Sequence, residues 1–130
     1  IEEPSHASEW DKAVWRQKHQ LWDLETVYAV IADKSIPVSF FCGGSRNSDQ
    51  FIPRLDGVFI LDVPDIEILF RRMDERVAID PTDFGGKPEE KELVKHLHQT
   101  KEDIPKRGIM IDATQPLEQV IDDILMNCKI

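Results

Sequence analysis

The chain has 130 residues, of which 41% are hydrophobic and 32% charged, a composition that predicts one folded soluble domain and excludes a disordered segment. Its net charge of −9 argues against a general nucleic-acid binder or an anionic-membrane binder, because both ligands repel an acidic protein. No apolar run is long enough to span a bilayer, and two cysteines are too few for a disulfide framework. We therefore expect a cytoplasmic protein with reduced thiols.

The N-terminal part of the chain predicts two helices. The first covers residues 5–20, with Trp10 and Val14 on one face. The second covers residues 24–34 and starts after Asp23, whose side chain can cap a helix. Its apolar residues recur at the helical spacing i, i+3, i+4, i+7: Leu24, Val27, Tyr28 and Ile31.

Two apolar segments then predict strands. Residues 37–42 read Pro-Val-Ser-Phe-Phe-Cys and end at Gly43-Gly44, as a short strand would. A short helix is expected over residues 48–54. Residues 57–63 are almost continuously apolar, as in a parallel strand that is covered on both faces.

The remaining elements alternate in the same way. Pro64 suits the first turn of a helix, and residues 77–87 are polar and glycine-containing, which predicts a flexible lid-like loop. Pro88 begins a charged helix, residues 108–112 form the last strand, and a final amphipathic helix follows from Leu117.

This alternation of strands and helices predicts parallel β-α-β crossovers. The expected fold class is therefore α/β, a three-layer α/β/α domain with a mainly parallel sheet, formed by residues 1–130 as a single domain or a domain fragment. Such folds bind ligands at the carboxyl ends of their strands. Three loops are expected there: 43–47, 62–65 and 112–115.

Four short segments in this order carry a family resemblance. They are Trp22-Asp23-Leu24, then Phe41-Cys42-Gly43-Gly44 with Asn47, then Asp83-Phe84-Gly85 followed by Lys87-Pro88-Glu89-Glu90, and finally Asp112-Ala113-Thr114 with Pro116 and Val120. Over residues 21–128 they resemble P-loop small-molecule kinases, especially bacterial nucleoside-kinase-like ATPases. Two positions depart from the pattern in the lid, where Gly86 is an extra glycine and Thr82 stands in place of asparagine.

The resemblance covers only the C-terminal portion of such a kinase. No G-x-x-x-x-G-K-[ST] phosphate-binding loop occurs in the chain, and the N-terminal strands that precede it in the family are missing. The chain is then either a fragment, with the remainder lost or on another chain, or a protein in which residues 37–42 and 57–63 pair in a modified sheet.

The resemblance also implies a set of phosphate-binding residues. Arg76 ends the helix before the lid, where the lid arginines of the family lie, and Arg72 shares its helix face. Arginine suits phosphoryl transfer because its planar fork binds phosphate oxygens. Lys87, beyond the two glycines, could swing onto a ligand. The alternative is that the two arginines are solvated and offset Asp74 and Glu75, and that Lys87 is a solvated loop residue.

Two further loops provide candidate contacts. Arg46 and Asn47 follow the glycine pair and are candidates for acceptor-substrate binding, with a tight turn as the alternative. By resemblance, the nucleotide base would be flanked by Asp112, Thr114, Gln115 and Pro116. These four residues also suit a strand-end turn that leads into a helix cap, and the two interpretations are compatible.

The expected function is ATP-dependent phosphoryl transfer to a nucleoside or related small molecule, with this chain supplying the lid and the nucleotide-base side. ATP and Mg²⁺ are implied by the resemblance alone. The alternative is a non-catalytic nucleotide-binding or assembly module. We expect no metal site of the chain's own, because His96 and His98 point in different directions on a helix. We also expect a homodimer or association with a missing N-terminal segment, because an incomplete sheet exposes unpaired edges.

Overall fold

The computed structural model describes residues 5–128 and shows a mixed α/β chain that is mostly helical, with a small two-stranded parallel sheet. The chain divides into two compact units that are each built from two separate segments. We call residues 5–19 with 63–102 the helical unit, and residues 20–62 with 103–128 the sheet unit. Between residues 5 and 128, no helix is both long and apolar enough to cross a membrane.

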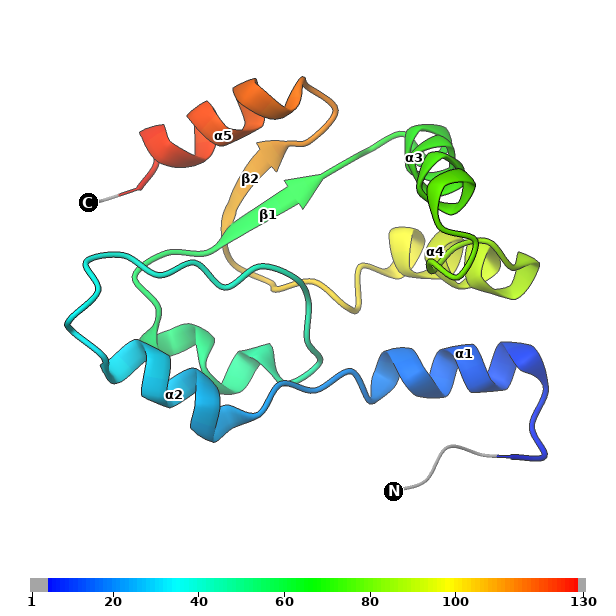
Figure 1. Cartoon of the computed structure of the whole chain (residues 1–130), viewed down its shortest axis with the longest axis horizontal. Coiled ribbons are helices and arrows are strands. Elements are labelled where there is room, and N and C mark those ends of the chain that lie inside the picture. Colours follow the sequence, from blue (N-terminus) through cyan, green and yellow to red (C-terminus); the bar gives the residue numbers. More distant parts are fainter. Residues whose placement is uncertain (1–4, 129–130) are drawn as a thin grey trace. The chain divides into compact units, whose positions relative to one another are not determined.

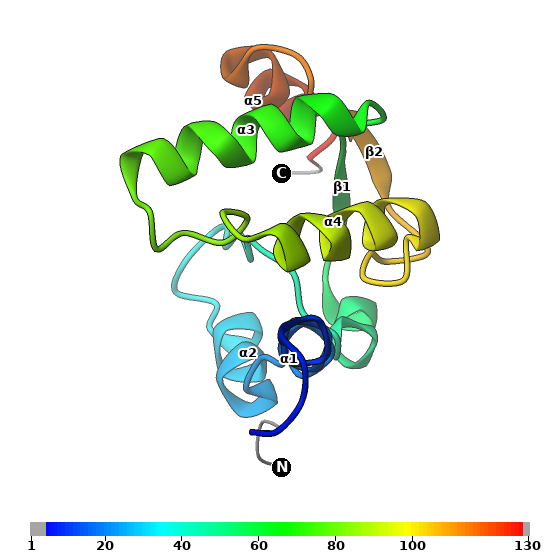
Figure 2. The same ribbon diagram turned by 90° about the vertical axis from the view of Figure 1, so that its right-hand side faces the viewer.

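The helical unit consists of α1 (Glu9–Lys18), α3 (Ile66–Ile79) and α4 (Pro88–Thr100). The chain reverses direction between α3 and α4, which form a helical hairpin, and α1 packs against α4 (Figure 2). The core of the unit is built around Leu93, which is 2% exposed, together with Met73 and Ala13. Two local caps set helix starts, since the side chain of Ser8 accepts a hydrogen bond from Asp11 N, and that of Asp65 accepts one from Glu67 N.

The boundaries of α3 differ from those expected from the sequence. The helix begins after Asp65 rather than at Pro64, because the Asp65 carboxylate satisfies the free N–H of Glu67. It also continues through Ile79, so the connecting loop runs from Asp80 to Lys87 instead of starting at residue 77. Val77, Ala78 and Ile79 contain no helix breaker, and the first strong turn former after them is Pro81.

The sheet unit contains α2 (Leu24–Ala32), two 3₁₀ turns (Ser48–Gln50 and Ile52–Arg54), β1 (Phe59–Asp62), β2 (Ile109–Asp112) and α5 (Leu117–Met126). Strands β1 and β2 lie side by side in parallel, and α5 follows directly from β2 (Figure 1). The register pairs Phe59 with Ile109 and Asp62 with Asp112. The strands predicted over residues 57–63 and 108–112 are thus confirmed at slightly shorter lengths.

The predicted strand over residues 37–42 is wrong. These residues have no regular secondary structure, and no backbone hydrogen bond joins them to another described segment. Phe41 alone turns inward, where its ring centroid lies 6.1 Å from that of Trp22, whereas Phe40 is 57% exposed. An apolar segment becomes a strand only when a neighbouring strand receives its backbone groups, and the described chain supplies none here.

Candidate functional site

A groove lies along one face of α3. It has a volume of about 470 Å³ and is lined by residues of that helix: Leu69, Arg72, Met73, Glu75, Arg76 and Ile79. The spacing of these positions places them on one side of the helix, which confirms that Arg72 and Arg76 share a face. Leu69, Met73 and Ile79 give the groove apolar walls, while the two guanidinium groups supply positive charge.

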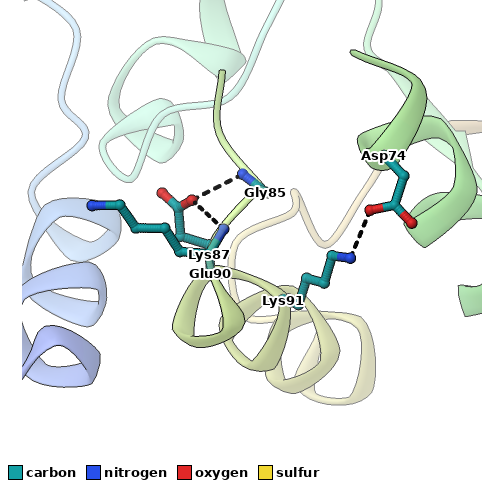
Figure 3. A network of polar contacts seen from close by, with 5 residues as sticks. All are labelled: Asp74, Gly85, Lys87, Glu90 and Lys91. Atoms are coloured by element: carbon teal, nitrogen blue, oxygen red, sulfur yellow. Dashed lines mark hydrogen bonds and ion pairs between the residues drawn. The ribbon is translucent and has the colours of Figure 1, made fainter. Parts of the chain in front are cut away.

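The charges near the groove are only partly compensated. The Lys91 ammonium lies 2.6 Å from Asp74 Oδ1 and pairs with this carboxylate, one of the two that the arginines would offset in the alternative interpretation (Figure 3). Neither Arg72 nor Arg76 makes an ion pair or hydrogen bond with any residue from 5 to 128. Glu75 is the one carboxylate that lines the groove, so the groove carries two positive charges and one negative charge.

The loop that follows α3 is fixed by three local contacts. The Asp80 carboxylate accepts hydrogen bonds from the backbone N–H and the hydroxyl of Thr82, at 3.0 and 2.7 Å. Both bonds lower the pKa of Asp80, and the bond from the Thr82 hydroxyl has the larger effect. Gly85 is buried and has φ of +107°. Its Cα lies so close to α3 that a Cβ there would come within 2.5 Å of Met73 Cε.

Glu90 ties the end of this loop to the start of α4. Its Oε1 accepts hydrogen bonds from the backbone N–H groups of Gly85 and Lys87, at 3.1 and 3.2 Å (Figure 3). The second bond is one half of a helix capping box, because Glu90 is the third residue of α4 and Lys87 is its N-cap. The backbone of Lys87 is therefore held in place, while its side chain is exposed. The loop that is expected to act as a lid thus has specific hydrogen bonds near both of its ends.

The predicted base-side residues form a closed hydrogen-bonded turn in the sheet unit. Asp112 Oδ1 accepts bonds from the backbone N–H and the hydroxyl of Thr114, and Gln115 Nε2 donates to the Asp112 carbonyl at 3.0 Å. Gln115 Nε2 also donates to Asp123 Oδ2 at 2.9 Å. Pro116 precedes α5 and its carbonyl accepts from the first turn of that helix. These residues therefore join β2 to α5, as the strand-end interpretation requires.

The two residues that are predicted to bind the acceptor, Arg46 and Asn47, both contact the backbone that precedes α2. The Asn47 amide is used twice, since its Oδ1 accepts from Trp22 N at 3.1 Å and its Nδ2 donates to Trp22 O at 2.8 Å. The indole of Trp22 in turn stacks on Phe51 with a centroid distance of 5.5 Å. Arg46 is anchored through its backbone N–H, which donates to Gln20 O at 2.8 Å. Asn47 therefore holds the loop that presents Arg46.

The two histidines of α4 face different partners. His98 Nε2 lies 2.9 Å from the Val63 carbonyl, whereas His96 lies 3.6 Å from the Glu102 carboxylate and edge-on to Trp10. Across the part of the chain that is described, no three His, Cys, Asp or Glu side chains come close enough together to hold a metal ion.

Sequence reasoning missed two features of this site. It did not indicate that Leu69 and Met73 border a groove, although Met73, at 4% exposed, is also part of the core of the helical unit. Glu90 carried a usable signal, because a Glu at the third helical position is typical of a capping box. The pairing of Asp74 with Lys91 had no signal, since these residues lie on different helices, 17 positions apart.

Comparisons of the chain with models of protein families, with curated protein sequences and with solved structures give no match.

Proposed function

We propose that this chain supplies the lid and the nucleotide-base side of an ATP-dependent enzyme that transfers a phosphoryl group to a nucleoside or related small molecule. The observation that carries the proposal is the α3 groove, where Arg72 and Arg76 lack a carboxylate partner among the described residues while Asp74 is paired with Lys91. Further support comes from the parallel β1–β2 pair followed by α5, which suits a three-layer, P-loop-kinase-like fold.

The chemistry of phosphoryl transfer explains why two unpaired arginines matter. Negative charge spreads over the oxygens of the transferring group, so catalysis depends mainly on positioning and on charge stabilisation. A guanidinium remains protonated and can donate two parallel hydrogen bonds to a phosphate. Arg72 and Arg76 would hold the phosphates on α3, and the apolar walls of the groove would limit competition from water.

The other residues receive supporting roles. Glu90 holds the backbone of Lys87 through a hydrogen bond, and the Lys87 side chain would add a third positive charge from the loop. The turn formed by Asp112, Thr114, Gln115 and Pro116 would flank the base through its backbone and outer surface, because its polar side chains bond to one another. Arg46 would contact the acceptor, with Asn47 as the residue that positions it.

The described residues fit a phosphate group better than a metal ion. They hold no cluster of three metal-ligating side chains, so Mg²⁺ would arrive bound to the ATP phosphates, as is usual for this ion. ATP bound in this way supplies the phosphoryl group.

The test is a titration of the chain with ATP, followed through the side-chain Nε–H signals of its arginines by ¹⁵N NMR. We expect weak binding, with a dissociation constant above about 1 mM, because two arginines without a phosphate-binding loop provide less than about 4 kcal/mol. The shifts should be largest for Arg72 and Arg76. Arg71, which is exposed on the same helix and does not line the groove, provides the matched control.

Single substitutions distinguish binding in the groove from general charge attraction. Arg76→Ala should abolish the shift at Arg72 or reduce it severalfold, whereas Arg71→Ala should leave it unchanged. Equal losses in both variants would mean general charge attraction and would contradict the proposal. In a preparation that catalyses phosphoryl transfer, Arg76→Ala should lower kcat by about 10²-fold, the scale of losing one oriented charge-stabilising donor. Turnover within a factor of about two of the unmodified protein would exclude a catalytic role for Arg76.

A non-catalytic assembly module is the second candidate, and the exposed apolar side chains of the sheet unit favour it. Leu61, Met110 and Leu117 are between 56% and 73% exposed. Nucleoside-dependent transfer of phosphate from ATP, measured with and without the chain, distinguishes the two candidates.

A further inference from the structure

The outer edge of β1 has free backbone groups. The carbonyls of Val58 and Asp62 accept hydrogen bonds from Ile109 N and Ala113 N, so these residues direct their backbones toward β2. Because backbone groups alternate sides along a strand, Phe59 and Leu61 direct their N–H and C=O groups away from β2. No described segment pairs with that side, since the sheet contains only β1 and β2. The edge can therefore receive another strand.

The side chains around this edge are also incompletely covered. Leu61 is 57% exposed, although its register partner Ile111 is 3% exposed. Met110, which pairs with the buried Ile60, is 56% exposed. In each of these register pairs one side chain is buried and the other is exposed to solvent. The exposed apolar side chains could therefore be covered by a further segment.

The same chain carries an apolar segment without a partner. Ile36, Val38 and Phe40 occupy every second position and are 53%, 37% and 57% exposed. No backbone hydrogen bond connects this segment with other described residues. Alternation of this kind suits a strand with one apolar face, and Phe41, which packs against Trp22, anchors the segment at its end.

The absence of charged side chains favours contact between residues 36–42 of one copy and the β1 edge of a second copy. Two copies of a chain with net charge −9 repel each other over most of their surfaces. Residues 35–45 contain no charged side chain, and neither do residues 57–61. These stretches can approach each other without bringing like charges together.

We propose that residues 36–42 of one copy add as a strand to the outer edge of β1 in a second copy, and that the reciprocal contact forms at the same time. The resulting dimer has two identical strand contacts related by a two-fold axis, which is the common symmetry of homodimers. Main-chain hydrogen bonds to Phe59 and Leu61 would provide affinity, and the side chains of Ile36, Val38 and Phe40 would cover the exposed part of the sheet.

The mass of the chain in solution tests the proposal directly. Light scattering should give twice the chain mass of 15.0 kDa at high concentration. Phe40→Lys should raise the dissociation constant at least about tenfold, because it places a charge in the apolar contact. Phe84→Lys is the matched control, since Phe84 is a comparably exposed phenylalanine of the helical unit, and should leave the constant unchanged. A monomer at every concentration, or a dimer equally sensitive to both changes, would overturn the proposal.

Mixing two defective variants tests the reciprocal geometry. Phe40→Lys disables the donated segment and Leu61→Lys disables the receiving edge, so each variant alone loses both contacts. A mixture of the two retains one intact contact, and we expect a heterodimer that neither variant matches alone. No recovery on mixing would contradict this arrangement. Both side chains are more than half exposed, so the substitutions leave the fold intact.

Hydrogen exchange identifies the bonds themselves. The amide protons of Phe59 and Leu61 should exchange at least about tenfold more slowly in concentrated than in dilute protein, because strand addition gives them hydrogen-bond acceptors. A dimer in which these two amides exchange at the same rate as in the monomer would use another surface. Protection of these amides in a protein that stays monomeric would mean that a segment of the same chain fills the edge, which would also refute the proposal.

Discussion

Replacement of Gly85 by alanine probes how the loop between α3 and α4 is held. Gly85 has φ of +107°, and a Cβ at this position would lie 2.5, 3.1 and 3.3 Å from Met73 Cε, Cβ and Cγ. Met73 Cε could move aside, but Met73 Cβ is fixed to α3. A left-handed backbone costs a residue with a Cβ about 1–2 kcal/mol, and overpacking costs about 1–3 kcal/mol. We therefore expect Gly85→Ala to lower the free energy of unfolding by about 2–5 kcal/mol.

Urea unfolding followed by circular dichroism measures this loss. Gly44→Ala is the control, since no atom lies within 4 Å of a Cβ built there and its φ is not positive. It should change stability by less than about 1 kcal/mol, in the stabilising direction. If the two variants unfold at the same urea concentration, the loop is not packed on Met73 and the reasoning is refuted.

A double substitution separates the two causes. Met73→Ala removes the Cγ and Cε atoms that clash with a Cβ at residue 85, but leaves the backbone of Gly85 at the same positive φ. In this background, Gly85→Ala should cost less than in the unmodified protein, because only the positive φ and the 3.1 Å approach to the Cβ of residue 73 remain. An unchanged cost would show that the contacts with Met73 Cγ and Cε contribute nothing.

Two smaller changes test the other local contacts. Asn47→Ala removes both hydrogen bonds to the Trp22 backbone and should lower the free energy of unfolding in urea by about 1–3 kcal/mol. The control Asn127→Ala removes one exposed bond at the end of α5 and should lower it by less than about 1 kcal/mol. Equal losses would contradict the assigned role of Asn47. The Asp80 pKa, measured by ¹³C NMR, should lie below its ordinary value of 3.8 and return toward it in Thr82→Ala. Because the pKa is lowered in the folded state, the Asp80 carboxylate stabilises the turn above about pH 4, and this contribution disappears as the pH falls through the folded pKa. An unshifted Asp80 pKa in the unmodified protein would refute the hydrogen bonds to Thr82.

The elements with strong local signals were predictable from the sequence. The apolar spacing after Asp23 correctly predicted α2, and Pro88 correctly predicted the start of α4. Both strands that form the sheet were predicted because each is a short, continuously apolar run. These signals come from residues that are neighbours along the chain.

The errors arise where structure depends on distant partners. Residues 37–42 have the composition of a strand, but whether a strand forms depends on a neighbour that the described chain does not supply. Similarly, the shared face of Arg72 and Arg76 follows from helical spacing, whereas the pairing of Asp74 with Lys91 depends on how α3 meets α4. Neither the positive φ of Gly85 nor its closeness to Met73 can be read from the sequence, and both make glycine necessary at this position.

The connection between β1 and β2 affects how the chain folds. The two strands pair in parallel, yet α3, its loop and α4 all lie between them in the sequence. Closing this long connection costs entropy that the eight residues of the sheet recover only after both strands are in register. The helical hairpin, by contrast, forms through contacts between residues close in the chain, such as Lys91 with Asp74. The hairpin should therefore form first and shorten the effective separation of the two strands, so that sheet formation is the late and slower step during folding.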